Sequence, residues 1–266
     1  MELLADLSLG LAAALALFTL AWVVHLPLRD ASIVDPLWGP AFLVVAAVYA
    51  AVSGEGGPRR TLILALLALW ALRLGGYLLW RKWGEPEDRR YTAMREKWGE
   101  DTFPWLSLFL VFWLQAGILW VVSWPLFRAV RGESALSWLD ALGIVLFAAG
   151  FLFEAVGDLQ LARFKADPSN EGEVLDRGLW RYTRHPNYFG EILVWWGFGA
   201  IALASAPAEA WWTLAGPAVM TFLLLRVSGV SLLEEDIEER RPAYREYVRR
   251  TNALLPGPPK GRGAQA

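Results

Sequence analysis

Seven long apolar segments constrain the fold of this chain more than any other feature of its sequence. Each is close to the ~20 residues that an α-helix needs to cross the hydrocarbon core of a bilayer. The segments lie at about 3–24, 37–53, 61–80, 103–127, 138–157, 188–206 and 210–229. The chain is 56% hydrophobic, whereas a soluble globular domain is about 45–50% apolar. We therefore expect an all-α integral membrane protein, a bundle of about seven transmembrane helices.

Tryptophans favour the same interpretation, because many of the 16 lie near the ends of these segments. Such belts are typical of membrane interfaces. The first segment resembles a cleaved secretory signal in its position, but no Lys or Arg precedes it. Glu2 and Asp6 stand where the positive region of a signal belongs. We therefore predict that this segment is the first membrane helix.

Basic residues are divided unevenly between the two sides that seven spans would define. Nineteen of the 25 Lys and Arg fall on the side that holds the C-terminus, and four fall on the other side. The four are Arg59, Arg60, Arg128 and Arg131. The positive-inside rule then places the C-terminus in the cytoplasm and the N-terminus outside. Adding or removing one span would mix the two sides, so the imbalance also favours seven spans.

The chain shows no linker and no internal repeat, so we expect one transmembrane helical domain over residues 1–255. Residues 256–266 are rich in Pro and Gly and are predicted to be a disordered tail. The charged stretch 232–251 is predicted to be a helix outside the bilayer. There is no cysteine, which excludes disulfides and thiol chemistry. We expect the lipid bilayer as a partner, and neither nucleic acid nor a metal ion.

Ionisable residues inside or beside membrane spans are costly, so they point to paired or functional groups. In the third span, Arg73, Tyr77 and Arg81 are four residues apart and share one face of a helix. Between the first two spans, Asp35 stands just before Pro36, where a helix is expected to begin. Asp35 either caps that helix or faces a polar cavity that opens to the cytosol.

Three ionisable residues of the fifth span, Glu154, Asp158 and Lys165, also share one helix face. Arg73 lies deep in its span, so snorkelling to the interface is less favourable than pairing with a buried carboxylate. Glu154 or Asp158 is the expected partner, either as a structural pair or as part of the polar cavity.

The stretch GLWRYTRHPNYFGE, residues 178–191, places a basic cluster at the start of the sixth span. Pro186 suits the first turn of that helix, so its free backbone N–H groups point back toward Arg181, Arg184 and His185. Helix N-termini attract anions, and the cluster adds to that attraction. The sequence therefore predicts a phosphate site. The alternative is that the arginines contact lipid headgroups and the histidine is a local cap.

Several segments carry a resemblance to a known family. GLWRYTRHPNYFGE, the EAVGDLQLARFK before it and the LLEEDIEERRPAYREYVRRT after it resemble the steroid 5-alpha-reductase-like integral membrane family. SIVDPLWG and EDRRY resemble its bacterial branch. The wider superfamily with RHPNYFGE includes sterol reductases, isoprenylcysteine carboxyl methyltransferases and phospholipid methyltransferases. The resemblance covers nearly the whole chain, and implies a role in lipid metabolism in a bacterial inner membrane.

The resemblance implies a cofactor pocket that faces the cytosol in the C-terminal half, with NADPH in the reductases and S-adenosylmethionine in the methyltransferases. NADPH carries phosphates and calls for several Arg or Lys donors, whereas S-adenosylmethionine has no phosphate. The loop between the fifth and sixth spans supplies five: Arg163, Lys165, Arg177, Arg181 and Arg184. This favours NADPH. The predicted cofactor-binding residues are Asp158, Arg163, Lys165, Arg181, Tyr182, Arg184, His185, Asn187, Tyr188 and Glu191. The resemblance itself implies Asp158, Asn187 and Glu191, and Lys165 stands where the animal steroid reductases tend to have arginine.

The implied reaction is transfer of hydride from NADPH to a C=C bond conjugated with a carbonyl in a lipophilic, steroid-like or isoprenoid-like substrate. A proton donor must polarise the carbonyl oxygen. Steroid reductases hold it with a Gln-Glu pair and a tyrosine; this chain lacks the pair, and Asp35 and Tyr77 are the catalytic candidates. Tyr77 is the predicted donor, because a phenol is protonated at neutral pH, and Tyr91 of EDRRY is next. The alternatives are a methyltransferase of a lipid or prenylated substrate and a non-catalytic membrane protein.

Overall fold

The computed structural model describes residues 2–227, 229–230 and 243–260, and the elements in this part of the chain are helices joined by turns and loops. Among the described residues, seven segments are long and apolar enough to cross a membrane. They are Leu3–Leu28, Ala31–Val52, Pro58–Lys82, Phe103–Val122, Trp138–Ala166, Pro186–Ser205 and Pro207–Val227. The predicted all-α membrane bundle with seven spans is thereby confirmed.

The chain divides into two compact units. The first comprises Met1–Asp140 and Ile201–Gly216, and the second comprises Ala141–Ala200 and Pro217–Ala266. The single domain over residues 1–255 stays a prediction. Residues 232–242 of the predicted surface helix and 261–266 of the predicted tail lie outside the described residues.

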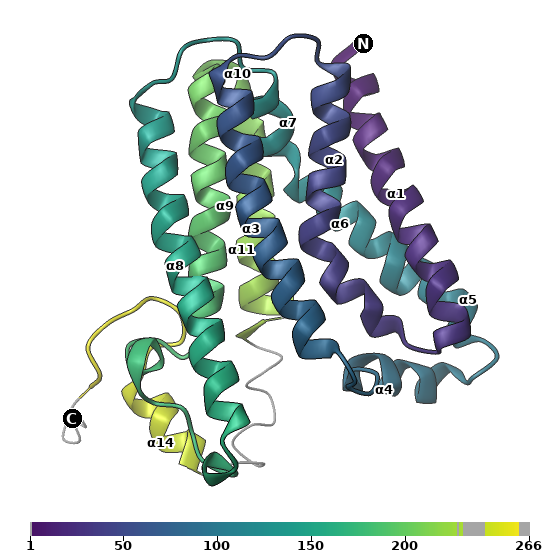
Figure 1. Cartoon of the computed structure of the whole chain (residues 1–266), viewed down its shortest axis with the longest axis vertical. Coiled ribbons are helices and arrows are strands. Elements are labelled where there is room, and N and C mark those ends of the chain that lie inside the picture. The colour runs from purple at the N-terminus through teal and green to yellow at the C-terminus, as the bar shows by residue number, and fades with distance from the viewer. Residues whose placement is uncertain (1, 228, 231–242, 261–266) are drawn as a thin grey trace. The chain divides into compact units, whose positions relative to one another are not determined.

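The first unit is built mainly from α1, α2, α3, α6 and α7 (Figure 1). Its long helices are runs of Leu, Ala and Val, and helical structure satisfies every backbone polar group that lipid cannot. In chain order the elements are α1 (Glu2–Leu28), the 3-10 turn η1 (Ala31–Leu37), α2 (Trp38–Val52), α3 (Pro58–Lys82), α4 (Arg89–Trp98), α5 (Phe103–Ser107), the π-helical η2 (Leu108–Trp113), α6 (Leu114–Val122), α7 (Trp124–Val130), α10 (Pro207–Ala210) and the 3-10 turn η5 (Trp211–Leu214).

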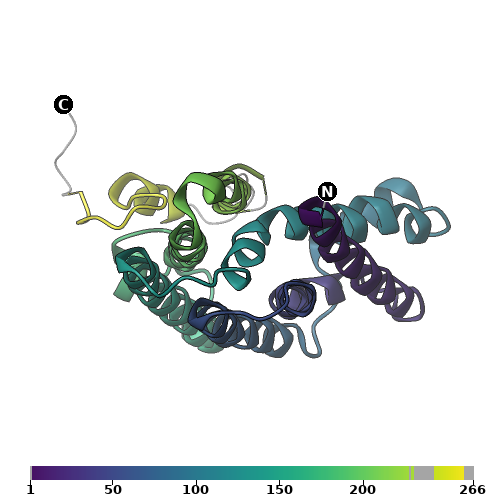
Figure 2. The same ribbon diagram turned by 90° about the horizontal axis from the view of Figure 1, so that it is seen from above.

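Small residues let the helices of this unit approach one another closely. A Cβ atom at Gly39 would lie 2.6 Å from the carbonyl oxygen of Ala71, so α2 and α3 meet backbone to backbone. Figure 2 shows these two blue helices side by side. Gly10 of α1 leaves room for the ring of Tyr49, whose hydroxyl lies 3.1 Å from Ser123 Oγ. These contacts fix α2, and with it the turn η1 that precedes it.

Arg59 is fully buried, although the sequence predicts that it lies in a loop between two spans. Its Nε and Nη2 donate to the two carboxylate oxygens of Asp140 over 2.8 and 2.9 Å. Its Nη1 donates to Ser134 Oγ over 2.9 Å, and Nη2 also donates to the Ala135 carbonyl over 3.0 Å. A buried ion pair with this many hydrogen bonds is tolerated because few of its polar atoms lack a hydrogen-bond partner.

The second unit contains most of α8, most of α9 and the helices after α10. In chain order the elements are α8 (Trp138–Ala166), the 3-10 turns η3 (Pro168–Asn170) and η4 (Gly178–Arg181), α9 (Pro186–Ser205), α11 (Ala215–Phe222), the π-helical η6 (Leu223–Val227) and α14 (Ala243–Arg250). α9 begins at Pro186, as predicted. A Cβ atom at Gly190 would lie 2.4 Å from Glu154 N, so α8 and α9 cross in close contact. The crossing brings the carboxyl groups of α8 to the start of α9.

Candidate functional site

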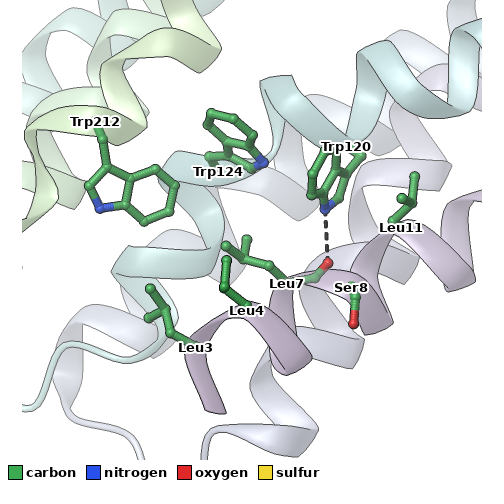
Figure 3. Close-up of a pocket in the computed structure, with 8 residues that line it drawn as sticks. All are labelled: Leu3, Leu4, Leu7, Ser8, Leu11, Trp120, Trp124 and Trp212. Carbon is green, nitrogen blue, oxygen red and sulfur yellow. Dashed lines mark hydrogen bonds between the residues drawn. The ribbon is translucent and has the colours of Figure 1, made fainter. Parts of the chain in front are cut away.

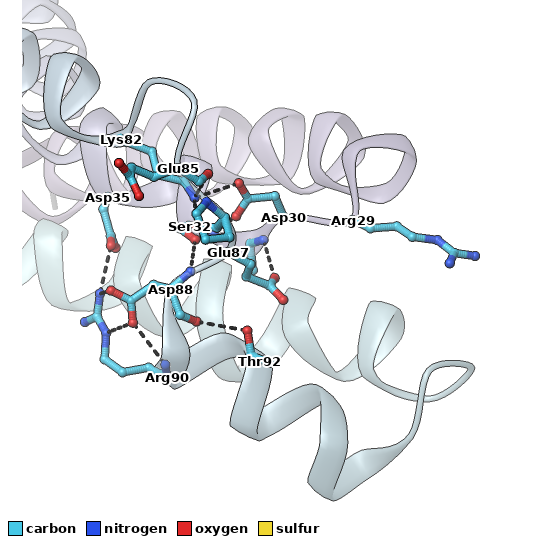
Figure 4. A network of polar contacts seen from close by, with 12 residues as sticks. Arg29, Asp30, Ser32, Asp35, Lys82, Glu85, Glu87, Asp88, Arg90 and Thr92 are labelled. Carbon is cyan, nitrogen blue, oxygen red and sulfur yellow. Dashed lines mark hydrogen bonds and ion pairs between the residues drawn. The ribbon is translucent and has the colours of Figure 1, made fainter.

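The connection between α1 and α2 is a polar turn at one end of the first unit (Figure 4). Asp30 caps η1, because its Oδ1 accepts hydrogen bonds from the N–H and the hydroxyl of Ser32 over 2.9 and 2.6 Å. Lys82, at the end of α3, forms an ion pair of 2.9 Å with Asp30. Burial opposes ionisation of Asp30, but the hydrogen bonds from Ser32 and Lys82 outweigh it and lower the pKa of this carboxyl. The turn is thus fixed, and it carries Asp35.

Asp35 is held by two consecutive residues at the start of α4. Arg90 Nη2 donates to Asp35 Oδ2 over 2.8 Å, and Tyr91 Oη donates to Oδ1 over 2.9 Å. α4 begins here because Asp88 is its N-cap and accepts from the backbone N–H of Arg90 over 3.0 Å. The N–H of Asp88 in turn donates to Ser32 Oγ over 2.7 Å, which joins α4 to η1.

Gln115 and Trp38 determine which group is the donor in the hydrogen bond between Tyr91 and Asp35. Trp38 Nε1 can only donate, and it donates to Gln115 Oε1 over 2.5 Å. The amide nitrogen of Gln115 therefore faces Tyr91 and donates to its oxygen over 3.3 Å. The hydroxyl proton of Tyr91 is then directed to Asp35. We call Asp35, Arg90, Tyr91, Gln115 and Trp38 the Asp35 cluster.

The surroundings of Tyr91 favour the neutral, protonated form of its phenol. The residue is 5% exposed. Burial, together with the negative charge of Asp35, raises the pKa of this phenol above its ordinary value. A neutral phenol can donate to an oxygen on which negative charge develops during a reaction. The Asp35 cluster therefore has the chemistry of a proton donor beside a carboxylate.

Asp35 and Tyr77, the two predicted catalytic residues, occupy different surroundings. Asp35 lies within η1, and α2 begins only at Trp38 with no side-chain cap, so the capping alternative for Asp35 is wrong. Tyr77 contacts Trp80, with ring centroids 6.0 Å apart, and the Arg81 guanidinium, 5.7 Å from its ring. The shared face of Tyr77 and Arg81 is thus confirmed. The phenol that donates to Asp35 belongs to Tyr91, the second candidate from the sequence.

In the second unit, the loop between α8 and α9 folds back against the end of α8. Gln160 Oε1 accepts from the N–H of Leu179 over 3.0 Å, and Trp180 Nε1 donates to the Gly157 carbonyl over 3.1 Å. The hydroxyl of Tyr247, on α14, donates to the Trp180 carbonyl. These contacts hold η4 between α8 and α14.

Three arginines line a cavity of about 390 Å³ beside η4, which we call the Arg181 cavity. Its lining includes Asp176, Arg177, Gly178, Arg181, Arg250 and Thr251. Arg250 forms an ion pair of 3.2 Å with Asp176. Arg177 lies over the ring of Phe164 at 5.7 Å and interacts electrostatically with Asp167, and within the described residues neither Arg177 nor Arg181 forms an ion pair. The cavity therefore carries a surplus of positive charge that suits an anion.

Arg184, in contrast, is buried and points to the end of α14. Its Nη1 donates to the carbonyls of Val248 and Thr251 over 3.2 and 2.5 Å. A cation at a helix C-terminus satisfies terminal carbonyl groups and interacts favourably with the helix dipole. Arg184 thereby joins α14 to the start of α9, a structural role that the sequence did not reveal.

The remaining predicted cofactor residues lie either at the crossing of α8 with α9 or on the surface. Asp158 is buried and its Oδ1 accepts from Asn187 Nδ2 over 3.1 Å. His185 is also buried and stacks on Tyr188, with ring centroids 5.4 Å apart. Glu191 is half-buried, one turn after Asn187. The exposed members of the set are Arg163, Lys165 and Tyr182.

Comparison with known proteins places the chain in a family without a described activity. A family model described as a protein of unknown function (DUF1295) matches residues 21–251. An uncharacterized protein of Schizosaccharomyces pombe is 27% identical in an alignment of 279 positions, which covers 93% of this chain and 78% of that protein. A probable O-methyltransferase of Ustilaginoidea virens is 36% identical over 74 residues, 28% of this chain and 25% of that protein. No solved structure matches the chain.

Proposed function

Because this chain belongs to the DUF1295 family, and because its motifs resemble steroid 5-alpha-reductase-like proteins, we propose that it is a membrane-embedded, NADPH-dependent reductase. The substrate is a lipophilic molecule, steroid-like or isoprenoid-like, with a C=C bond conjugated to a carbonyl. The Arg181 cavity of the second unit is the proposed place of the anionic cofactor.

The single observation that supports NADPH is the Arg181 cavity. NADPH has a diphosphate and a 2′-phosphate, and guanidinium groups match phosphate oxygens in both charge and geometry. Arg177 and Arg181 form no ion pair among the described residues, so their donors are available to such an anion. The volume of about 390 Å³ is in the range of small-molecule pockets. S-adenosylmethionine has no phosphate, so it would leave the positive charge of the Arg181 cavity without an anionic partner.

When bound, NADPH supplies the hydride that adds to the β-carbon of the conjugated bond. The chain then has to stabilise the negative charge on the carbonyl oxygen and supply one proton. We assign the proton to Tyr91, whose raised pKa keeps the phenol neutral. Asp35 orients that phenol. Its carboxylate is 25% exposed, so it can pass a proton from solvent back to Tyr91 after turnover.

Thermal unfolding of the purified full-length protein in detergent tests the choice of cofactor. NADPH at ~100 times its Kd should stabilise the folded state by ~2.7 kcal/mol and raise Tm. NADH should raise Tm less, because it lacks the 2′-phosphate. Arg181→Ala should reduce the shift with NADPH, whereas Arg249→Ala should not, because Arg249 is an exposed neighbour on α14. A shift with S-adenosylmethionine and none with NADPH would overturn the reductase proposal.

A methyltransferase is the second candidate function, favoured by one observation. The probable O-methyltransferase of Ustilaginoidea virens shares 36% identity over 74 residues, and RHPNYFGE also occurs among methyltransferases of the wider superfamily. In that case S-adenosylmethionine should raise Tm, and the shift should be insensitive to Arg181→Ala because no phosphate is bound.

A further inference from the structure

An apolar groove of about 480 Å³ lies at the N-terminal end of α1 in the first unit (Figure 3). Four leucines of α1 form one wall, and three tryptophans, Trp120, Trp124 and Trp212, form the other. The Asp35 cluster follows the opposite end of α1, a helix of 27 residues that is about 40 Å long. The groove is therefore separate from the Asp35 cluster.

The tryptophan wall is fixed by contacts within the unit. Trp120 Nε1 donates to the carbonyl of Leu7 over 2.8 Å, as Figure 3 shows, so a hydrogen bond joins the two walls and satisfies the polar atom of the ring. Trp120 and Trp124 meet edge to face with centroids 5.4 Å apart, and Trp124 meets Trp212 at the same distance. The rings thus offer a rigid apolar surface, whose shape suits an unbranched hydrocarbon chain.

Two ion pairs involve residues that lie close along the chain to lining residues of this groove. Arg131 pairs with Asp6, next to Leu7, over 2.7 Å. Arg128, one turn after Trp124 on α7, pairs with Glu209 over 3.0 Å, and Glu209 lies three residues before Trp212. The Glu209 side chain is 75% exposed. The buried Nε of Arg128 has no hydrogen-bond partner among the described residues. This rim therefore presents a carboxylate that is open to solvent, paired with a guanidinium whose Nε is buried.

From this pattern we propose that the groove binds one acyl chain of a phospholipid whose headgroup carries both a phosphate and a primary ammonium. Apolar contact alone cannot select a ligand within a bilayer, because every lipid tail is as apolar as leucine. Selection must come from the rim. The phosphate oxygens match Arg128, and the ammonium, with three N–H donors, matches Glu209. Phosphatidylethanolamine has this combination of groups.

Native mass spectrometry of the delipidated full-length protein tests this site with three lipids of equal chain length. Phosphatidylethanolamine should bind roughly tenfold more tightly than phosphatidylcholine or phosphatidylglycerol, a ratio that corresponds to about 1.4 kcal/mol. Glu209→Gln should remove that preference while chain binding persists. Ser8→Trp should abolish binding of all three lipids, because Ser8 is an exposed residue that lines the groove. Leu9→Trp is the matched control, since Leu9 is exposed and lies outside the lining.

Equal binding of the three lipids, or a preference for phosphatidylglycerol, would overturn the assignment of the headgroup and with it the proposal. Lipid binding that survives Ser8→Trp would show that the lipid sits elsewhere, and a dimer mass that Ser8→Trp removes would show that a second copy of the chain fills the groove. Glu209→Gln changes an exposed side chain and gives an independent result should Ser8→Trp fail to fold. None of these outcomes depends on NADPH.

Discussion

Tyr91 and Tyr77 are both phenols near the same end of the first unit, and the hydroxyl of Tyr91 donates to Asp35. The two assignments of the proton donor can be separated by removing one oxygen at a time. With a substrate identified through NADPH oxidation, Tyr91→Phe should lower kcat by roughly 10²-fold, the size of general acid catalysis. The NADPH-dependent rise in Tm should stay unchanged. Tyr77→Phe serves as the matched variant, and a loss of turnover there but not in Tyr91→Phe would return the role to Tyr77.

Gln115 is a positioning residue for the same phenol, because its amide stands between Trp38 and Tyr91. Gln115→Leu would leave the Trp38 N–H without its acceptor and release Tyr91 from its fixed orientation. An unmet buried polar group costs about 1–3 kcal/mol. We expect a lower Tm in detergent, and we expect Gln115→Glu, which keeps the acceptor oxygen, to recover most of the loss. Equal Tm values for Gln115→Leu and the wild type would contradict this role.

Acid should destabilise the connection between the first three helices. Burial opposes the ionisation of Asp88, but hydrogen bonds from Arg90 lower the pKa of this carboxyl below its ordinary 3.8, as Ser32 and Lys82 do for Asp30. A carboxyl whose folded pKa is lowered stabilises the protein above its unfolded pKa, and this stabilisation is lost as the pH falls through the folded pKa. Tm should therefore fall below about pH 4. In Asp88→Asn the acid-dependent part of that fall should be smaller.

At the scale of elements, the close crossing of α8 and α9 depends on glycine. A Cβ atom at Gly190 would lie 2.4 Å from Glu154 N and 2.5 Å from the Gly150 carbonyl, so even alanine would push the two helices apart. We expect Gly190→Ala to lower Tm and to weaken NADPH binding, since the carboxyl groups of α8 would move away from the start of α9. Gly76→Ala is the control, because a Cβ there meets no atom within 4 Å. A Gly190→Ala protein as stable as the Gly76→Ala protein would show that the crossing is not tightly packed.

Elements defined by local composition could be predicted from the sequence, whereas pairings between distant residues could not. The seven spans follow from runs of apolar residues, and the start of α9 follows from Pro186. The pair of Arg59 with Asp140 joins residues 81 positions apart, and nothing local marks either one as buried. Likewise, the role of Arg184 at the end of α14 depends on where a later helix packs. The sequence points to Tyr91 only through the EDRRY motif. Its hydrogen bond to Asp35 depends on the meeting of the turn η1 with the cap of α4, which are distant in the sequence.

For the whole molecule, the orientation in the membrane is still a prediction, and it depends on the division of 19 basic residues against four. Three of those four form ion pairs in the first unit: Arg59, Arg128 and Arg131. The positive-inside rule counts Lys and Arg whether or not they are paired, so four against 19 still predicts the N-terminus outside and the C-terminus in the cytoplasm. A fluorescent reporter fused to the C-terminus should be active in the cytoplasm, and alkaline phosphatase fused to the N-terminus behind a secretion signal should be active outside. Finding both ends on the same side would require an even number of spans and would contradict the seven helices assigned to the membrane.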